Sequence, residues 1–200
     1  RGISFISYGQ NYYKNGIGSI AKKDFVKITK KLSIDLVNRF YIKRKNFKTD
    51  NWYSRNDYLK ANTSNSEGLK FIRSLSNLKG KKILYASHAF ADAPHAPGSL
   101  IFNDYFEQFK ETLRHAQSDD KNIWIFRAHQ NSRLLNEKKI FKEFIYYKKR
   151  KNILLCPDNV PIEKLLNKCD VVITGRGTIG FESAALGKKV IITGAAPYSG

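Results

Sequence analysis

Short apolar segments alternate with amphipathic ones between residues 81 and 193, and no other feature of the sequence constrains the fold as strongly. Strands of a parallel sheet that is buried on both faces are continuously apolar, and helices connect them. The alternation therefore predicts an α/β fold, a Rossmann-like parallel sheet with helices on both faces. The expected strands cover residues 83–86, 123–126, 153–156, 171–174 and 190–193.

The segments between these strands carry helical signals. Helices are expected around residues 102–113 and over residues 137–147, 161–168 and 179–186. Pro161 suits the first turn of a helix, because the N–H that it lacks would have no intrahelical partner there. Gly187 suits the position just past a helix end.

The sequence before residue 79 has a different pattern. It predicts a strand over residues 3–8 and helices over residues 24–43 and 66–75, separated by polar or glycine-containing loops. We expect residues 1–78 to be the end of an N-terminal domain or an accessory, mostly helical segment, and residues 79–200 to be the Rossmann-like domain. The chain contains no Met and ends soon after its last expected strand, so we expect a fragment with a truncated C-terminus.

The chain of 200 residues is strongly basic, with 36 Lys and Arg against 17 Asp and Glu and a formal net charge of +19. Its hydrophobic fraction of 42% excludes a disordered basic tail, and no apolar run is long enough to span a bilayer. Most of the excess charge lies in residues 1–60 and 121–151, which include the blocks Lys43-Arg44-Lys45 and Lys148-Lys149-Arg150-Lys151. Such blocks bind anionic lipid, polymer or nucleic acid, or form a solvated face.

Polar segments follow four of the expected strands, over residues 87–98, 127–132, 157–159 and 175–182. Ligands of open parallel sheets bind beyond the carboxyl ends of the strands, so these segments are expected to meet at one edge. In the turn Gly175-Arg176-Gly177-Thr178, backbone N–H groups, a guanidinium and a hydroxyl can bind a phosphate at a helix N-terminus. An ordinary βα turn is the alternative interpretation.

Three further residues are candidates for binding or acid–base chemistry. Glu182, one turn into that helix, can accept both ribose hydroxyls of a nucleotide, or it interacts only with the helix dipole. His129, two residues after Arg127 at a strand end, can donate to a phosphate or act as a general acid, or it is structural. Asp92 is a candidate general base.

The loop that contains Asp92 also allows a metal-binding interpretation. His88, Asp92 and His95 have a spacing that can hold a metal, but the loop is interrupted by prolines and no fourth ligand is evident. We therefore expect no metal there.

Several segments together resemble a known group of proteins. "SHAFADAPH" followed by "LIFNDYFEQFKETL" is similar to bacterial surface-polysaccharide biosynthesis proteins. "WIFRAHQNS" is similar to the K-x-H-P segment of capsule-synthesis transferases and CDP-glycerol glycerophosphotransferases. "DNVPIEKLLNKCDVVITGRGTIGFESAALGKKVIITG" looks like the donor-binding half of a GT-B glycosyltransferase. The resemblance covers residues 79–200 and implies a capsule or lipopolysaccharide glycosyltransferase, Kdo-transferase-like or sialyltransferase-like.

The resemblance implies a role for each candidate residue. His129 would contact the donor phosphate and assist its departure, and Asp92 would be the base on the acceptor hydroxyl. The donor would be bound by Arg127, Gly175, Arg176, Gly177, Thr178 and Glu182, the last of these at the ribose. No metal or other cofactor is implied. Gln130 replaces the proline of the motif, and Arg127 stands where lysine is common.

The implied partners are a nucleotide sugar, for example a CMP-linked one, a glycan or glycolipid acceptor and an anionic membrane surface, with no specific nucleic acid. Two cysteines and the lack of a signal-peptide pattern fit a cytoplasmic protein, and the basic faces fit a position at the inner face of the cytoplasmic membrane. The alternatives are an enzyme like the CDP-glycerol glycerophosphotransferases, a sugar-nucleotide epimerase on the same scaffold, and a non-enzymatic polyanion-binding module.

Overall fold

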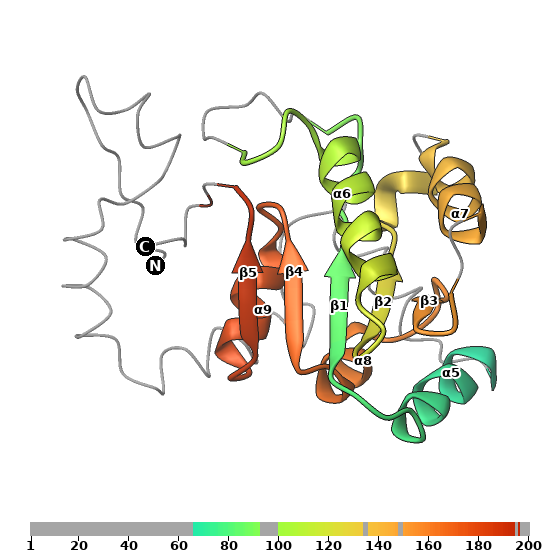
Figure 1. Ribbon diagram of the computed structural model, residues 1–200. Helices are drawn as coiled ribbons and strands as arrows, with labels where there is room; N and C mark the ends of the chain where they lie inside the picture. The colour runs from blue at the N-terminus through green and yellow to red at the C-terminus, as the bar shows by residue number, and fades with distance from the viewer. Residues whose placement is uncertain (1–65, 93–99, 134–135, 148–149, 195, 197–200) are drawn as a thin grey trace, which may run out of the picture.

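The computed structural model describes residues 66–92, 100–133, 136–147, 150–194 and 196. Within these residues the backbone forms a five-stranded sheet, in which every neighbouring pair of strands is parallel. The strands are β1 (Lys82–Ala86), β2 (Ile123–Arg127), β3 (Ile153–Leu155), β4 (Val171–Thr174) and β5 (Lys189–Ile192). Figure 1 shows that their carboxyl ends lie at one edge of the sheet. The predicted parallel α/β sheet is confirmed.

The order of the strands across the sheet is β3-β2-β1-β4-β5. The chain adds β2 and β3 on one side of β1, and it then crosses over to add β4 and β5 on the other side. The connections that leave β1 and β4 therefore run in opposite directions, which opens a crevice beyond the carboxyl ends of these two strands. This topological switch point is where doubly wound sheets bind their ligands.

Helices cover both faces of the sheet (Figure 1). They are α5 (Ser66–Ser76), α6 (Tyr105–Ser118), α7 (Glu137–Tyr147), α8 (Ile162–Lys168) and α9 (Thr178–Ala185), with a short 3-10 helix at Gln130–Arg133. α6 and α7 pack on one face, and α5 and α8 pack on the other, where α9 lies against β4 and β5. This two-sided cover explains why the central strands are apolar at successive positions.

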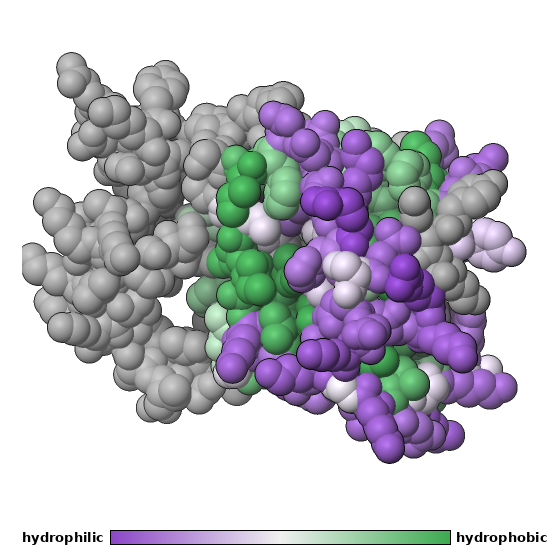
Figure 2. Space-filling model, in the orientation of Figure 1, coloured by the Kyte–Doolittle hydropathy of each residue, from purple (hydrophilic) through white to green (hydrophobic). Residues whose placement is uncertain are grey.

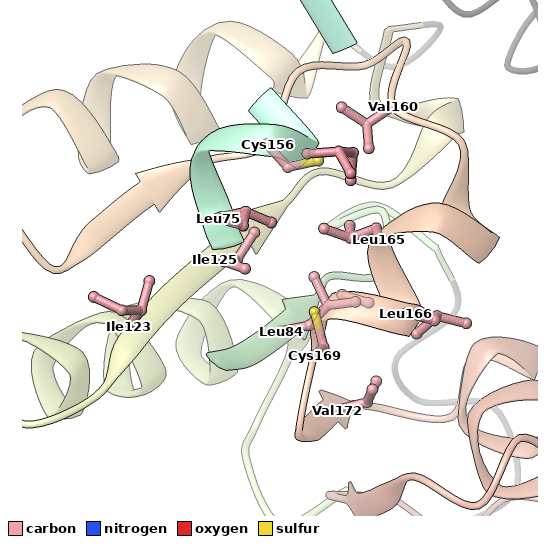
Figure 3. Close-up of a cluster of buried hydrophobic side chains, with 12 residues drawn as sticks. Leu75, Leu84, Ile123, Ile125, Cys156, Val160, Leu165, Leu166, Cys169 and Val172 are labelled. Carbon is pink, nitrogen blue, oxygen red and sulfur yellow. The ribbon is translucent and has the colours of Figure 1, made fainter. Parts of the chain in front are cut away.

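An aliphatic core joins α5 and α8 to the sheet. Leu84 of β1 packs with Leu75 of α5 and Leu165 of α8, and all three side chains are fully buried (Figure 3). Cys156 and Cys169 lie in the same core as free thiols. Burial raises the pKa of Cys169 to about 12, so this thiol is a packing group rather than a nucleophile.

An aromatic core joins α6 and α7 to the opposite face. Tyr85 of β1 and Phe126 of β2 have ring centroids 5.4 Å apart. Phe109 of α6 and Phe141 of α7 stack above them with centroids 4.7 Å apart. Because successive side chains of a strand point to opposite faces, β1 supplies Leu84 to one core and Tyr85 to the other.

Two helix starts differ from the sequence-based expectation. α6 begins at Tyr105 rather than near residue 102, because Asp104 takes the N-cap position and accepts the backbone N–H of Glu107 at 2.6 Å. α8 begins one residue later than expected, because Pro161 is its N-cap with an extended ψ of 127° and not its first helical residue. Outside α6, the strand and helix ends agree with the expected ends to within one residue.

Residues 1–65 lie outside the described part of the chain, and with them the expected strand over residues 3–8 and the expected helix over residues 24–43. α5 precedes the expected domain boundary at residue 78, yet its Ile72 and Leu75 belong to the core of the sheet. The division into domains stays a prediction. Among the described residues, no helix has the length and apolar character needed to cross a membrane.

The surface view separates polar from apolar regions. Figure 2 shows hydrophilic side chains over α6 and an apolar area over β5. Ile191 of β5 is 51% exposed, and Ile101, whose backbone N–H donates to the Thr193 carbonyl at 2.9 Å, is 76% exposed. The apolar surface in this view therefore follows the β5 edge of the sheet.

Candidate functional site

Segments that follow β1, β2 and β4 meet at the topological switch point. His88 follows β1, and its ring stacks on Tyr105 of α6 at a centroid distance of 4.3 Å and an interplanar angle of 11°. The ring of His129, which follows β2, lies parallel to it at 6.0 Å and 3°. Arg176, which follows β4, donates its backbone N–H to Nε2 of His88 at 3.2 Å. The expected convergence of these segments is confirmed.

His88 is a neutral imidazole in this setting. Its side chain is only 13% exposed, and burial, helped by the neighbouring charge of His129, lowers its pKa to about 4. Nε2 accepts a hydrogen bond from Arg176, so the single proton of the neutral ring is on Nδ1. Nδ1 lies 3.6 Å from Oδ2 of Asp92, which makes the donor side of the ring face a carboxylate.

The glycine turn after β4 is packed closely against this ring stack. A methyl group at Gly175 would lie 2.9 Å from Cε1 of Tyr105 and 3.0 Å from Cδ2 of His88, which is too close for any side chain. Gly177 is the N-cap of α9 and makes no side-chain capping bond. The first turn of α9 thus presents backbone N–H groups at the crevice, as an anion-binding helix N-terminus does.

Arg176 and Thr178 add side-chain groups to this turn. Nε of Arg176 donates to the Tyr105 hydroxyl at 3.2 Å, which ties the guanidinium to α6 beside the His88 ring. Thr178 is the first residue of α9 and is exposed. The turn therefore combines a cation, a hydroxyl and a helix N-terminus, the three features that favour phosphate at one place.

The loop after β1 is fixed from α7. The Glu137 carboxylate accepts the backbone N–H groups of Phe90 at 2.8 Å and Ala91 at 2.5 Å. The Phe90 ring packs edge-on against Phe106 at 5.2 Å. Asp92 directly follows these anchors, and its side chain is 57% exposed. The loop thus presents an accessible carboxylate from a well-anchored backbone.

The segment after β2 is fixed in a similar way. The His129 backbone N–H donates to Oγ of Ser87 at 3.1 Å, so the ends of β1 and β2 are tied together. Arg127 takes a different direction: its guanidinium donates to the Val160 carbonyl at 2.8 Å and lies 3.9 Å from Sγ of Cys156. Arg127 would have to leave this carbonyl to bind a donor phosphate, so its assigned role stays a prediction.

Glu182 lies in the second half of α9 and is 9% exposed. Together with Gly180 and Ser183 it forms the buried side of this helix. Its role at a ribose also stays a prediction. His95 lies outside the described residues, and within those residues no three His, Cys, Asp or Glu side chains are grouped as metal ligands.

A cavity of about 410 Å³ opens at the same edge of the sheet. It lies beyond the carboxyl ends of β2 and β3, beside α7. Its lining residues are Glu67, Ala128, Lys138, Phe141, Lys142, Leu155, Cys156, Pro157, Asp158 and Asn159. Lys138 and Asp158 form an ion pair across it. Its lining includes Ala128, the residue before His129, and its size suits a small organic ligand.

Sequence reasoning missed two residues that organise the site. Tyr105 has an apolar helix position in the sequence, and only the tertiary structure shows that its ring stacks on His88 and its hydroxyl accepts from Arg176. Gln108 also lies on the buried side of α6, where its Nε2 donates to Oγ1 of Thr193 at 2.6 Å. Gln108 could have been identified from the sequence, because it is a polar residue among apolar ones on one face of the helix.

The family model for capsule polysaccharide biosynthesis proteins matches residues 22–200. This chain belongs to that family. The resemblance that the sequence motifs indicated is thus confirmed for the family. A comparison with curated proteins finds no match.

Solved structures with a similar fold include two transferases from Thermosulfurimonas dismutans. KpsC, beta Kdo 2,7 transferase, is 18% identical to the present chain, with a TM-score of 0.45. The match covers 74% of the present chain and 48% of the KpsC chain. KpsC, beta Kdo 2,4 transferase, is 15% identical, with a TM-score of 0.41 over 70% and 48%. The wall teichoic acid polymerase TagF is 21% identical, with a TM-score of 0.33 over 68% and 30%. The chain thus spans about half the length of the KpsC structures or less.

Proposed function

We propose that this chain is the donor-binding part of a GT-B-type glycosyltransferase, which moves a sugar from a nucleotide donor to a growing capsule or lipopolysaccharide glycan. The observation that carries the proposal is the meeting of His88, His129 and the Gly175–Thr178 turn at the topological switch point. Membership of the capsule polysaccharide biosynthesis family supports a role in the synthesis of such a glycan. A glycine turn at a helix N-terminus binds the phosphate or diphosphate of a nucleotide. This supports a sugar nucleotide as the donor.

The donor phosphate would bind at the first turn of α9. The helix N-terminus, the Thr178 hydroxyl and the Arg176 guanidinium supply hydrogen bonds and positive charge at this position. His129 would donate a hydrogen bond to the phosphate from the other side. These groups stabilise the negative charge that develops on the leaving nucleotide, and this stabilisation is the largest contribution that such a site makes to the rate. Since the chain supplies this charge itself, we propose a transfer without a metal ion.

The acceptor would lie on the Asp92 side of the site. Asp92 takes the proton of the acceptor hydroxyl, the acceptor oxygen forms a bond to the anomeric carbon, and the bond from that carbon to the donor phosphate breaks. The exposed carboxylate of Asp92 is accessible to a glycan, whereas the buried Glu182 is not. Glu182 would bind the ribose from within the α9 side of the crevice.

With the ribose at Glu182, the sugar of the donor would extend from the phosphate toward the cavity beside α7. This cavity of about 410 Å³ lies within the usual range of small-ligand sites. Its Asn159 and Lys138 side chains can form hydrogen bonds with sugar hydroxyls. The exposed basic residues Arg150 and Lys151 would hold the protein at the anionic inner face of the cytoplasmic membrane, close to a lipid-linked acceptor.

Calorimetry with CMP, CDP, UDP and GDP tests the proposal. We expect one of these nucleotides to bind, and His129→Ala, Glu182→Gln and Arg176→Ala to weaken that binding by about tenfold each. His115→Ala and Arg114→Ala are matched controls, since both residues are exposed on α6, and should bind as the native chain does. Lack of nucleotide binding, or equal binding by all variants, would overturn the proposal.

Donor turnover separates the alternatives. Incubation of the bound donor with and without a capsule or lipopolysaccharide acceptor, followed by NMR, should show a new glycosidic product only with the acceptor. A donor that changes on its own would indicate an epimerase, and transfer from CDP-glycerol alone would indicate a glycerophosphotransferase. Turnover that survives a chelator would support transfer without a metal, and loss that added Mg²⁺ restores would contradict it.

A further inference from the structure

His88 has no part in the phosphate and acceptor contacts of the proposed transfer, yet it touches every segment of the site. Its ring stacks on Tyr105 and lies parallel to the ring of His129. Its Nε2 contacts the turn after β4, and its Nδ1 faces the loop carboxylate of Asp92. The charged and titratable groups around it are thus Asp92, His129, Arg176 and the Tyr105 hydroxyl.

We propose that His88 is a positioning residue, whose neutral ring aligns the Asp92 carboxylate through Nδ1–H and the Gly175–Thr178 turn through Nε2. This inference rests on the proposed function, because it assigns Asp92 to the acceptor side and the turn to the donor side. One ring would therefore set the distance between the acceptor-side carboxylate of Asp92 and the donor-side Gly175–Thr178 turn. Protein groups that react together need such a fixed geometry, because a displacement of about 1 Å can cost about a hundredfold in rate.

The hydrogen-bond pattern leaves one arrangement of the ring proton. A backbone N–H can only donate, so Nε2 must carry a lone pair, and a neutral imidazole then has its proton on Nδ1. Nδ1 is buried and 3.6 Å from Oδ2 of Asp92, and a small closure of the exposed Asp92 side chain makes this a hydrogen bond. Burial lowers the pKa of His88 to about 4, which keeps the ring neutral at the pH of the cytoplasm.

The packing around His88 leaves the ring little freedom to turn. Gly175 allows the turn to lie directly against Cδ2 of His88, and Gly177 lies beside Nε2. The backbone of His129 is tied to Ser87, the residue before His88, at 3.1 Å. A rotation of the ring would break the bond to Arg176 and the stack on Tyr105 together.

The first test needs no activity. In the ¹⁵N-labelled chain at pH 7, the two-bond couplings of the His88 ring report which nitrogen carries the proton. We expect a proton on Nδ1 and none on Nε2, together with an Arg176 amide signal that shifts in His88→Phe. A proton on Nε2, or a doubly protonated ring at pH 7, would overturn the inference whatever the enzyme does.

The second test separates the two contacts. In His88→Gln the amide oxygen can accept from Arg176 in place of Nε2, and in His88→Asn the amide N–H can donate to Asp92 in place of Nδ1. We expect His88→Gln to keep the donor KM but lower kcat by about tenfold, and His88→Asn to raise the donor KM by about tenfold. His88→Phe, which keeps only the stack on Tyr105, should show both effects.

His115→Gln on the exposed end of α6 serves as the matched control and should have native kinetics. If all three His88 variants have native kinetics, or if His88→Gln and His88→Asn each change kcat and KM in the same proportion, His88 does not align the two sides. If the native chain binds no nucleotide, the proposed function fails, and the NMR result still decides whether His88 holds Asp92 and the turn.

Discussion

Gly175 is the residue on which the close packing of the site depends. Its Cα lies where any Cβ would meet Tyr105 and His88 at 2.9 and 3.0 Å. Both rings are held by further contacts, so neither can move away freely. We expect Gly175→Ala to lower the free energy of unfolding by about 1–3 kcal/mol, the usual cost of overpacking.

Chemical denaturation of Gly175→Ala and Gly177→Ala tests this expectation. At Gly177 the nearest atom to a new methyl group is Oγ1 of Thr174 at 3.1 Å, and the ring of His88 is 3.5 Å away, so a smaller loss is expected. The N-cap φ of −65° at Gly177 is also available to alanine. A Gly175→Ala variant as stable as Gly177→Ala would contradict the packing described for the site.

The protonation of His88 links the site to the stability of the fold. In the unfolded chain histidine has a pKa near 6.5, whereas burial lowers the pKa of His88 to about 4 in the fold. Between these pH values the unfolded chain binds the proton more tightly. The contribution of His88 is therefore complete above pH 6.5 and is lost as the pH falls toward 4, with a size on the order of 3 kcal/mol.

Unfolding of the native chain and of His88→Gln across pH 4 to 7 measures this contribution. We expect the native chain to lose more free energy of unfolding than the variant as the pH falls, because the variant has no proton to take up at residue 88. Parallel curves for the two proteins would show that His88 already titrates at its ordinary pKa in the fold.

Residues at the site differ in how far the sequence predicts them. The turn Gly175–Thr178 and His129 follow strands, so their place at the carboxyl edge follows from the alternation pattern and the parallel topology alone. The contact of His88 with Arg176 joins residues 88 positions apart, and no local pattern encodes it. Arg127 also lies at a strand end, and the resemblance to capsule-synthesis transferases implied a role for it at the donor site. In the structure its guanidinium donates to the Val160 carbonyl, a contact that the strand-end position does not predict.

At the scale of elements, α6 connects the stability of the fold to the site. Two hydrogen bonds fix its N-terminus: the N-cap Asp104 accepts the N–H of Glu107 at 2.6 Å, and the Glu107 carboxylate accepts the N–H of Asn103 at 2.7 Å. Tyr105, the next residue after the cap, carries the ring that stacks on His88. The cap therefore fixes both the start of the helix and the position of this ring.

Asp104→Ala tests this link. We expect a loss of about 1 kcal/mol in the free energy of unfolding, as for other N-cap carboxylates. Asp104→Ser should restore most of it, since a hydroxyl can accept the same N–H. Asp120→Ala, at an exposed position after α6, is the control for removal of one negative charge. An Asp104→Ala variant with native stability, measured by urea unfolding, would mean that the cap contributes nothing.

The elements themselves were predicted well because their signals are local. Strands such as Val171–Thr174 are apolar runs between polar turns, and α7 has apolar residues at helical spacing, so both were found with their observed bounds. The predicted start of α6 was wrong because Phe102 continues the apolar spacing of the helix. The helix instead begins after Asp104, which is its N-cap. The strand order required the structure, since the spacing of segments does not say on which side of β1 each strand is added.

At the scale of the whole molecule, we relate the charge of +19 to the proposed position at an anionic membrane surface rather than to binding in the crevice. The described part of the excess lies in residues 121–151, which include the exposed Arg150 and Lys151. We expect the chain to co-sediment with vesicles that contain phosphatidylglycerol and to be released as salt is raised, since each basic residue near the surface contributes about 1 kcal/mol. Equal binding to neutral vesicles would contradict a role of the charge.

The central claim is that the crevice between β1 and β4 binds the nucleotide of a sugar donor. It is tested most directly by titrating the ¹⁵N-labelled chain with the nucleotide that calorimetry selects and following the backbone amide signals. The claim predicts that the largest shifts occur at Arg176, Gly177 and Thr178 and at His88 and His129, and that His129→Ala reduces them. Saturable shifts confined to the amino ends of the strands, or to the basic residues 150–151 alone, would contradict it.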